Sequence, residues 1–166
     1  MGLLFVSLLR LLLPLLILKW ALLGMVVCSL LDAFDVYFPG FPPLESFYQY
    51  QEWDKILDLY YLSFALFVSF SWKDLLSKKI SLLFYLLRAT GTALFLITAS
   101  RAWLFFFPNL FEYFYLFYLG SIVIFKQNLI RNKKDLAIII GAIILLKLPQ
   151  EYILHFKRYS FWNWFK

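Results

Sequence analysis

Cysteine and histidine are almost absent from this sequence, and their scarcity excludes several kinds of site. The one cysteine, Cys28, lies inside an apolar run, and the one histidine is His155. The chain therefore has no intrachain disulfide, no CxxC pair and no Cys/His cluster for zinc. It also lacks a nucleophile elbow, a phosphate-binding loop, a dinucleotide fingerprint and a zinc-protease motif.

Charge is also scarce, and hydrophobic residues take its place. Charged residues make up 16% of the 166 residues and hydrophobic residues 63%, against roughly 25% and 45–50% in soluble domains. The net charge of +6 comes from lysines and arginines in short segments between apolar runs, where they orient helices in a membrane. We therefore expect no nucleic-acid partner. The expected partners are the lipid bilayer, with lipid headgroups or another membrane protein as further candidates.

Five apolar runs predict an all-α fold, a polytopic transmembrane bundle with four or five transmembrane helices in one integral membrane domain, residues 1–166. A spanning helix needs about 20 mostly apolar residues. The expected helices cover residues 11–31, 56–72, 80–107, 110–125 and 136–156, with bounds read from the sequence. A single helix over residues 2–31 would be about 45 Å long, so part of it must tilt or leave the hydrocarbon core. The last run crosses only if its helix continues past Pro149.

The distribution of basic residues predicts the orientation. Loops 73–79 and 126–135 are rich in lysine and arginine and fall on the same side, and such loops mark the cytoplasmic face. The expected location is a bacterial-type cytoplasmic membrane with the N-terminus inside. The acidic segment 32–55 and the Pro108-Asn109 turn then lie outside, and the side of the C-terminus stays open.

Ionisable residues inside a bilayer are costly, by roughly 2.5–3.5 kcal/mol each, and therefore indicate a functional or tightly paired site. The expected helix order brings many of them towards the extracytoplasmic side. Arg88 is expected to pair with Asp58 or Glu112, or else to hold an anionic headgroup. His155 is a candidate proton-transfer group or metal ligand. The candidate polar cluster comprises Asp32, Asp35, Asp54, Asp58, Arg88, Arg101, Glu112, Glu151 and His155.

Four of these residues form a candidate metal site for a divalent cation: Asp32, Asp35, Asp54 and Asp58. Aspartates three or four residues apart share one face of a helix, and carboxylates are the ligands that Mg²⁺, Mn²⁺ and Ca²⁺ prefer. The alternative is that they cap or end their helices at the water.

In order and spacing these four aspartates also resemble the carboxylates of membrane CDP-alcohol phosphotransferases, which would imply a metal-dependent activity. The resemblance covers residues 32–58, and Val36 and Tyr50 stand where that family has glycine.

Three hypotheses for function follow, and whether the chain is an enzyme is left open. The first is a non-enzymatic membrane component that packs its own bundle, or a partner, through buried ion pairs. The second is a small membrane-embedded enzyme, possibly metal-dependent, acting on a lipid or lipid-linked substrate. The third is an ion or proton pathway through Arg88, Glu112, Glu151 and His155. The first is preferred because no catalytic constellation is complete.

Overall fold

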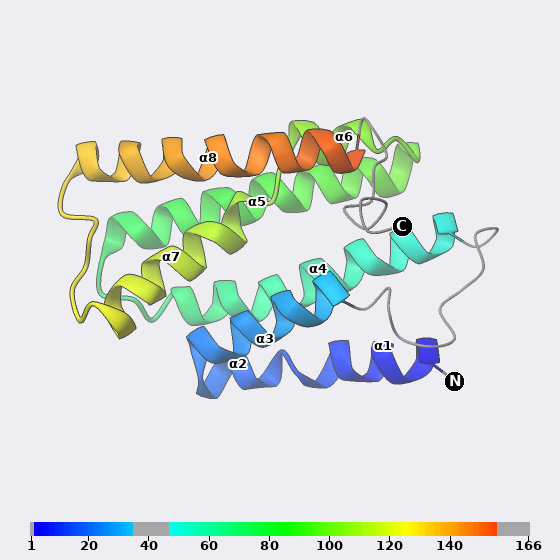
Figure 1. Ribbon diagram of the computed structural model, residues 1–166, viewed down its shortest axis with the longest axis horizontal. Helices are drawn as coiled ribbons and strands as arrows, with labels where there is room; N and C mark the ends of the chain where they lie inside the picture. The colour runs from blue at the N-terminus through cyan, green and yellow to red at the C-terminus, as the bar shows by residue number, and fades with distance from the viewer. Residues whose placement is uncertain (1, 35–46, 156–166) are drawn as a thin grey trace, which may run out of the picture. The chain divides into compact units, whose positions relative to one another are not determined.

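The computed structural model describes residues 2–34 and 47–155, and within these residues the chain is helical and has no strand. This confirms the predicted all-α fold. The helices form two compact units, Met1–Asp74 and Leu75–Lys166, each of which is described by itself (Figure 1).

The first unit begins with a helical hairpin. It consists of α1 (Gly2–Leu12), α2 (Leu15–Lys19) and α3 (Ala21–Phe34). The backbone leaves the helical region at Trp20, with φ −130° and ψ 75°, and α3 returns alongside α2 and α1 (Figure 1). The prediction of one helix over about 11–31 is therefore corrected. A 30-residue apolar run is too long for one straight crossing, and the reversal lets its two halves bury their apolar faces against each other.

Gly24 allows the two arms of this hairpin to come close together. A Cβ atom added at Gly24 would lie 2.5 Å from the backbone nitrogen of Ile17. Both residues are buried, and each is three or four residues from the reversal at Trp20. The small residue therefore sets the distance between α2 and α3.

The last helix of the first unit is α4 (Phe47–Ser69). It begins nine residues before the expected start at residue 56, because the polar residues that suggested a loop are part of the helix. Gln51 is buried and Asp54 is half-buried. Tyr60 donates a hydrogen bond to the Leu11 carbonyl oxygen at 3.2 Å, so α4 lies along the N-terminal arm of the hairpin.

The second unit contains α5 (Leu75–Thr98), α6 (Ala102–Phe106), α7 (Leu110–Ile124) and α8 (Lys133–His155). The expected helix 80–107 is interrupted at Ala99, whose φ of 59° is left-handed, and α6 packs back against α5.

The expected turn at Pro108-Asn109 is present. Asn109 caps α7 by accepting a hydrogen bond from the Glu112 backbone nitrogen. The last helix, α8, continues through Pro149 to its end at His155.

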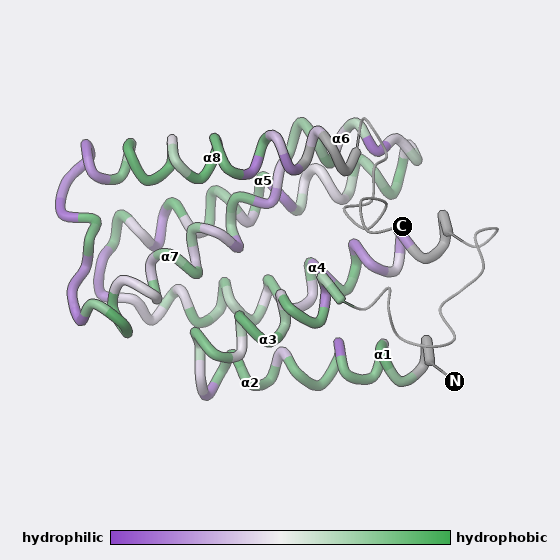
Figure 2. The backbone as a smooth tube through the Cα atoms, in the orientation of Figure 1, coloured by the Kyte–Doolittle hydropathy of each residue, from purple (hydrophilic) through white to green (hydrophobic). Residues whose placement is uncertain are grey.

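Large apolar side chains point out of both units. Phe67 on α4, Ile97 on α5 and Leu145 on α8 are 69%, 80% and 77% exposed, and Figure 2 shows long hydrophobic stretches on these helices. Among the described residues, two stretches are long and apolar enough to cross a membrane, Leu75–Thr98 and Ala102–Ile124. This gives coarse support for a membrane location.

Candidate functional site

Arg10 is the centre of a network of ion pairs that joins three helices of the first unit. Its guanidinium donates to Asp32 on α3 at 2.5 Å, and to Asp54 and Asp58 on α4 at 2.6 and 2.8 Å. The Arg10 side chain is only 5% exposed and that of Asp58 only 4%. Since both terminal nitrogens of the guanidinium are used, its planar geometry fixes the three carboxylates relative to α1.

Lys55 joins the network from the α4 side. Its ammonium lies 2.5 Å from the second carboxylate oxygen of Asp54 and 3.0 Å from that of Asp58. Each of these two aspartates is therefore held by Lys55 through one oxygen and by Arg10 through the other. We call Arg10, Asp32, Asp54, Lys55 and Asp58 the Arg10 network.

The formal charges of the Arg10 network do not balance. Arg10 and Lys55 neutralise Asp54 and Asp58, because each of these carboxylates contacts both cations. Asp32 is the additional carboxylate; it contacts Arg10, and its side chain is 28% exposed, more than that of the other two aspartates. Among the described contacts, Asp32 therefore joins α3 to the network as a third carboxylate against two cations.

Local sequence explains why these residues meet. Asp54 and Asp58 are four residues apart on α4 and share one face of the helix. Arg10 and Asp32 lie at nearly equal distances along the chain from the reversal at Trp20, so the hairpin places them side by side. In one straight helix the same two residues would be about 33 Å apart.

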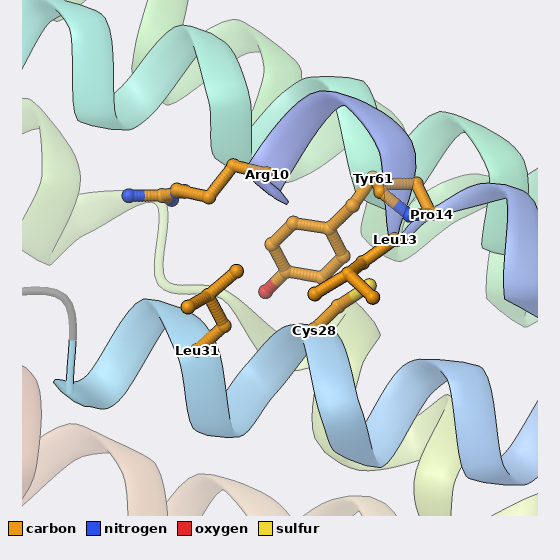
Figure 3. Close-up of a pocket in the computed structure, with 6 residues that line it drawn as sticks. All are labelled: Arg10, Leu13, Pro14, Cys28, Leu31 and Tyr61. Carbon is orange, nitrogen blue, oxygen red and sulfur yellow. The ribbon is translucent and has the colours of Figure 1, made fainter. Parts of the chain in front are cut away.

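A small pocket adjoins the Arg10 network. It is lined by Arg10, Leu13, Pro14, Cys28, Leu31 and Tyr61, and encloses no more than about 180 Å³. Figure 3 shows the Tyr61 ring between the two arms of the hairpin, with the Arg10 guanidinium directed away from the pocket. This space is below the roughly 300–1,000 Å³ of ordinary ligand sites, and its lining is mostly apolar.

Three of the predicted metal ligands do come together. Asp32, Asp54 and Asp58 each offer a carboxylate oxygen, and these atoms lie within 4.8 Å of one another. In this structure the cationic side chains of Arg10 and Lys55 contact the three carboxylates. The fourth predicted ligand, Asp35, lies outside the described residues.

The other members of the predicted cluster belong to the second unit. Arg88 is buried on α5, on the same helix face as the buried hydroxyls of Ser81 and Thr92. Its two expected partners have other contacts: Asp58 pairs with Arg10 and Lys55, and Glu112 accepts a hydrogen bond from Asn109 at 2.9 Å.

Arg101 precedes α6 and is half-buried. Glu151 and His155 belong to α8, and their side chains are outside the described part.

The second unit has its own polar contact between α7 and α8. Lys147 is 7% exposed, and its ammonium lies 4.8 Å from the centre of the Tyr113 ring. Gln150 accepts hydrogen bonds from Tyr113 at 2.9 Å and from Lys147 at 3.3 Å. A buried cation over an aromatic face stabilises the packing of these two helices.

Sequence reasoning missed Arg10 and Lys55. The sequence pattern places Met1–Arg10 either at the membrane interface or in an extension of the first helix, and in both cases far from Asp32. The signal that could have found it is the excess length of the first apolar run, which indicates a reversal near its middle at Lys19-Trp20. Lys55 was counted as a loop residue, although it stands between the two aspartates that it contacts.

Comparisons with protein families, with curated proteins and with solved structures find no match for this chain.

Proposed function

We propose that this chain is a non-enzymatic, multi-pass membrane component whose Arg10 network holds the helices of its first unit together. The observation that carries this proposal is the set of contacts from one buried guanidinium to aspartates on two other helices. An enzyme site needs charged groups that are free to meet a substrate. Here the cations and carboxylates form ion pairs with one another. The adjoining pocket is small and mostly apolar.

Besides the two apolar stretches in the second unit, helices α4 and α8 are also proposed to cross the membrane. Helices satisfy all of their own backbone hydrogen bonds, which is required in lipid. With 23 residues each, α4 and α8 are about 34 Å long, which is enough to cross a hydrocarbon core of about 30 Å. Both carry large exposed apolar side chains. We therefore propose a multi-pass bundle in which α4 and α8 also cross the membrane, with the ion pairs facing the bundle interior.

The decisive experiment replaces the centre of the network. Arg10→Met leaves the buried carboxylate of Asp58 and the half-buried carboxylate of Asp54 close to each other, with Lys55 still in contact with both. Removing one partner of a buried ion pair costs about 3–5 kcal/mol, so we expect a large fall in the melting temperature in detergent and in the amount of protein in the membrane. The matched control is Arg131→Met, because Arg131 is exposed and donates to Gln127. Equal behaviour of the two variants would contradict the proposal.

A second candidate function rests on the convergence of three carboxylate oxygens within 4.8 Å. A divalent cation at this point would have to displace Arg10, and the site would then serve a metal-dependent enzyme acting on a lipid or lipid-linked substrate.

Metal analysis of the purified protein, with the Asp54→Asn/Asp58→Asn double variant as control, tests this second candidate. Stoichiometric metal that disappears in the variant would support the enzyme. Equal, trace metal in both proteins would favour the ion-pair network.

A further inference from the structure

We infer that the end of the first unit formed by the α2–α3 corner and the C-terminal end of α4 binds the headgroups of anionic phospholipids. This inference rests on the proposed membrane location. It also makes residues 2–34 a hairpin that enters and leaves the bilayer from the same side.

The corner itself presents a basic and an aromatic side chain together. Lys19 is exposed, and its ammonium lies 4.6 Å from the centre of the Trp20 ring. Trp20 is 50% exposed. Both residues stand where the chain reverses, so their side chains are at the extreme end of the hairpin. An ammonium over an indole ring is a cation–π pair that tolerates partial removal from water.

The C-terminal end of α4 lies at the same end of the unit. α4 runs in the same direction as α1 and α2, because Asp58 contacts Arg10, Tyr60 contacts Leu11 and later residues pack against α2 (Figure 1). Directly after α4 come Phe70, which is 49% exposed, and the exposed Lys73. We call Lys19, Trp20, Phe70 and Lys73 the basic end of the unit.

Charge separates this end from the Arg10 network. Two exposed lysines stand at the basic end, whereas the three aspartates of the network lie further along the hairpin, about 14–18 Å from the reversal. One acidic residue, Asp74, also lies at the basic end; it directly follows Lys73 and is half-buried. Lysine and tryptophan are the residues that lie at headgroup depth, where the ammonium meets lipid phosphate and the indole stays at the edge of the hydrocarbon.

The lengths of the hairpin arms fit this placement. Gly2–Lys19 spans 18 residues, or about 27 Å, which is close to the thickness of the hydrocarbon core. With the basic end in the headgroups of one face, the N-terminal end of the same arm reaches the opposite face. Basic residues mark the cytoplasmic side. The N-terminus is therefore assigned to the extracytoplasmic side, the reverse of the orientation expected from a single helix over residues 11–31.

Accessibility labelling tests the placement of the basic end. Cys28 is the one native cysteine and is buried, so a Cys28→Ala background carries Lys19→Cys, Lys73→Cys or Phe34→Cys. The probe is a membrane-impermeant maleimide, applied to intact cells and to inverted vesicles. We expect Lys19→Cys and Lys73→Cys to react only in inverted vesicles and Phe34→Cys only in intact cells. Reaction of Lys19→Cys together with Phe34→Cys, or no reaction of Lys19→Cys from either side, would overturn the inference.

Lipid dependence tests the headgroup contact. The native chain is compared with Lys19→Gln/Lys73→Gln and with Lys19→Arg/Lys73→Arg in vesicles of phosphatidylcholine, with or without phosphatidylglycerol. Phosphatidylglycerol is expected to raise the melting temperature of the native and arginine proteins, and this rise should be mostly lost in the glutamine variant and in high salt. An equal rise in all three proteins would refute the headgroup contact.

Extraction with alkaline carbonate separates failure of this inference from failure of the proposed function. Release of the native chain into the supernatant would contradict the membrane location itself. Retention in the membrane, with the wrong labelling pattern, would contradict only the placement of the basic end.

Discussion

At the scale of single residues, Arg10 shows how one cation can organise several helices. A long guanidinium side chain reaches carboxylates on α3 and α4 at once, and its planar group of donors suits two or more acceptors. Lysine carries the same charge but not this geometry. The network therefore depends on the identity of residue 10 and not only on its charge.

The third carboxylate, Asp32, leads to a different prediction from that for Arg10. Replacing Arg10 should lower the melting temperature, whereas neutralising Asp32 should not. Asp32→Asn removes the third negative charge of the described network, and the side-chain oxygen of asparagine can still accept from Arg10. We expect the melting temperature to stay within a few degrees of the native value or to rise.

Asp58→Asn serves as the matched comparison for Asp32→Asn. Asp58 is buried and contacts both cations. Its neutralisation should therefore lower the free energy of unfolding by about 1–3 kcal/mol. Thermal unfolding of the two variants in the same detergent measures the difference. A larger loss in Asp32→Asn than in Asp58→Asn would show that the charge assignment is wrong.

At the scale of helices, both units contain a corner where a glycine lets a following segment lie close to a helix. A Cβ atom at Gly24 would meet the Ile17 backbone at 2.5 Å, and one at Gly91 would meet the Phe107 Cβ atom at 2.4 Å. The corners have different causes: Trp20 leaves the helical region with a negative φ, whereas Ala99 adopts a left-handed one. The close approach in each case depends on the absence of a side chain.

Gly24→Ala should therefore destabilise the first unit. The added methyl group meets backbone atoms that cannot move aside, and overpacking of this kind costs about 1–3 kcal/mol. The matched control is Gly141→Ala on α8, where nothing lies within 4 Å of the added atom and alanine favours the helix by roughly 0.5–1 kcal/mol. Thermal unfolding of both variants measures the difference. If Gly24→Ala were as stable as Gly141→Ala, the hairpin would not be as tightly packed as described.

At the scale of the whole molecule, several charged side chains are buried while many large apolar side chains are exposed. Arg10, Asp58, Arg88 and Lys147 are buried, whereas leucine, isoleucine and phenylalanine side chains are exposed along the helices. Large exposed apolar surfaces indicate a membrane or another apolar partner. Lipid as the surrounding solvent accounts for both halves of this pattern, because it favours apolar exteriors and forces charges to pair inside.

Membrane insertion of α8 can be tested on its exposed face. Leu145→Lys places a charge near the middle of the helix, where insertion is disfavoured by about 2.5–3.5 kcal/mol. We expect a marked fall in the membrane-inserted fraction, measured by protease protection of the segment after α8. The control Gln127→Lys adds the same charge in an exposed loop and should have little effect. Equal insertion of both variants would indicate that α8 lies on the surface of the membrane.

The sequence alone determined the helical class, the apolar character and several local boundaries of this protein. Hydrophobic runs and the Pro108-Asn109 signal depend on neighbouring residues, so they could be read without the fold, and α7 lies within one residue of its expected bounds. Only the tertiary structure decided which charges meet. The reversal at Trp20 places residues 10 and 32 in contact. The length of the apolar run indicates a reversal, but which side chains then meet depends on how the two helix surfaces pack.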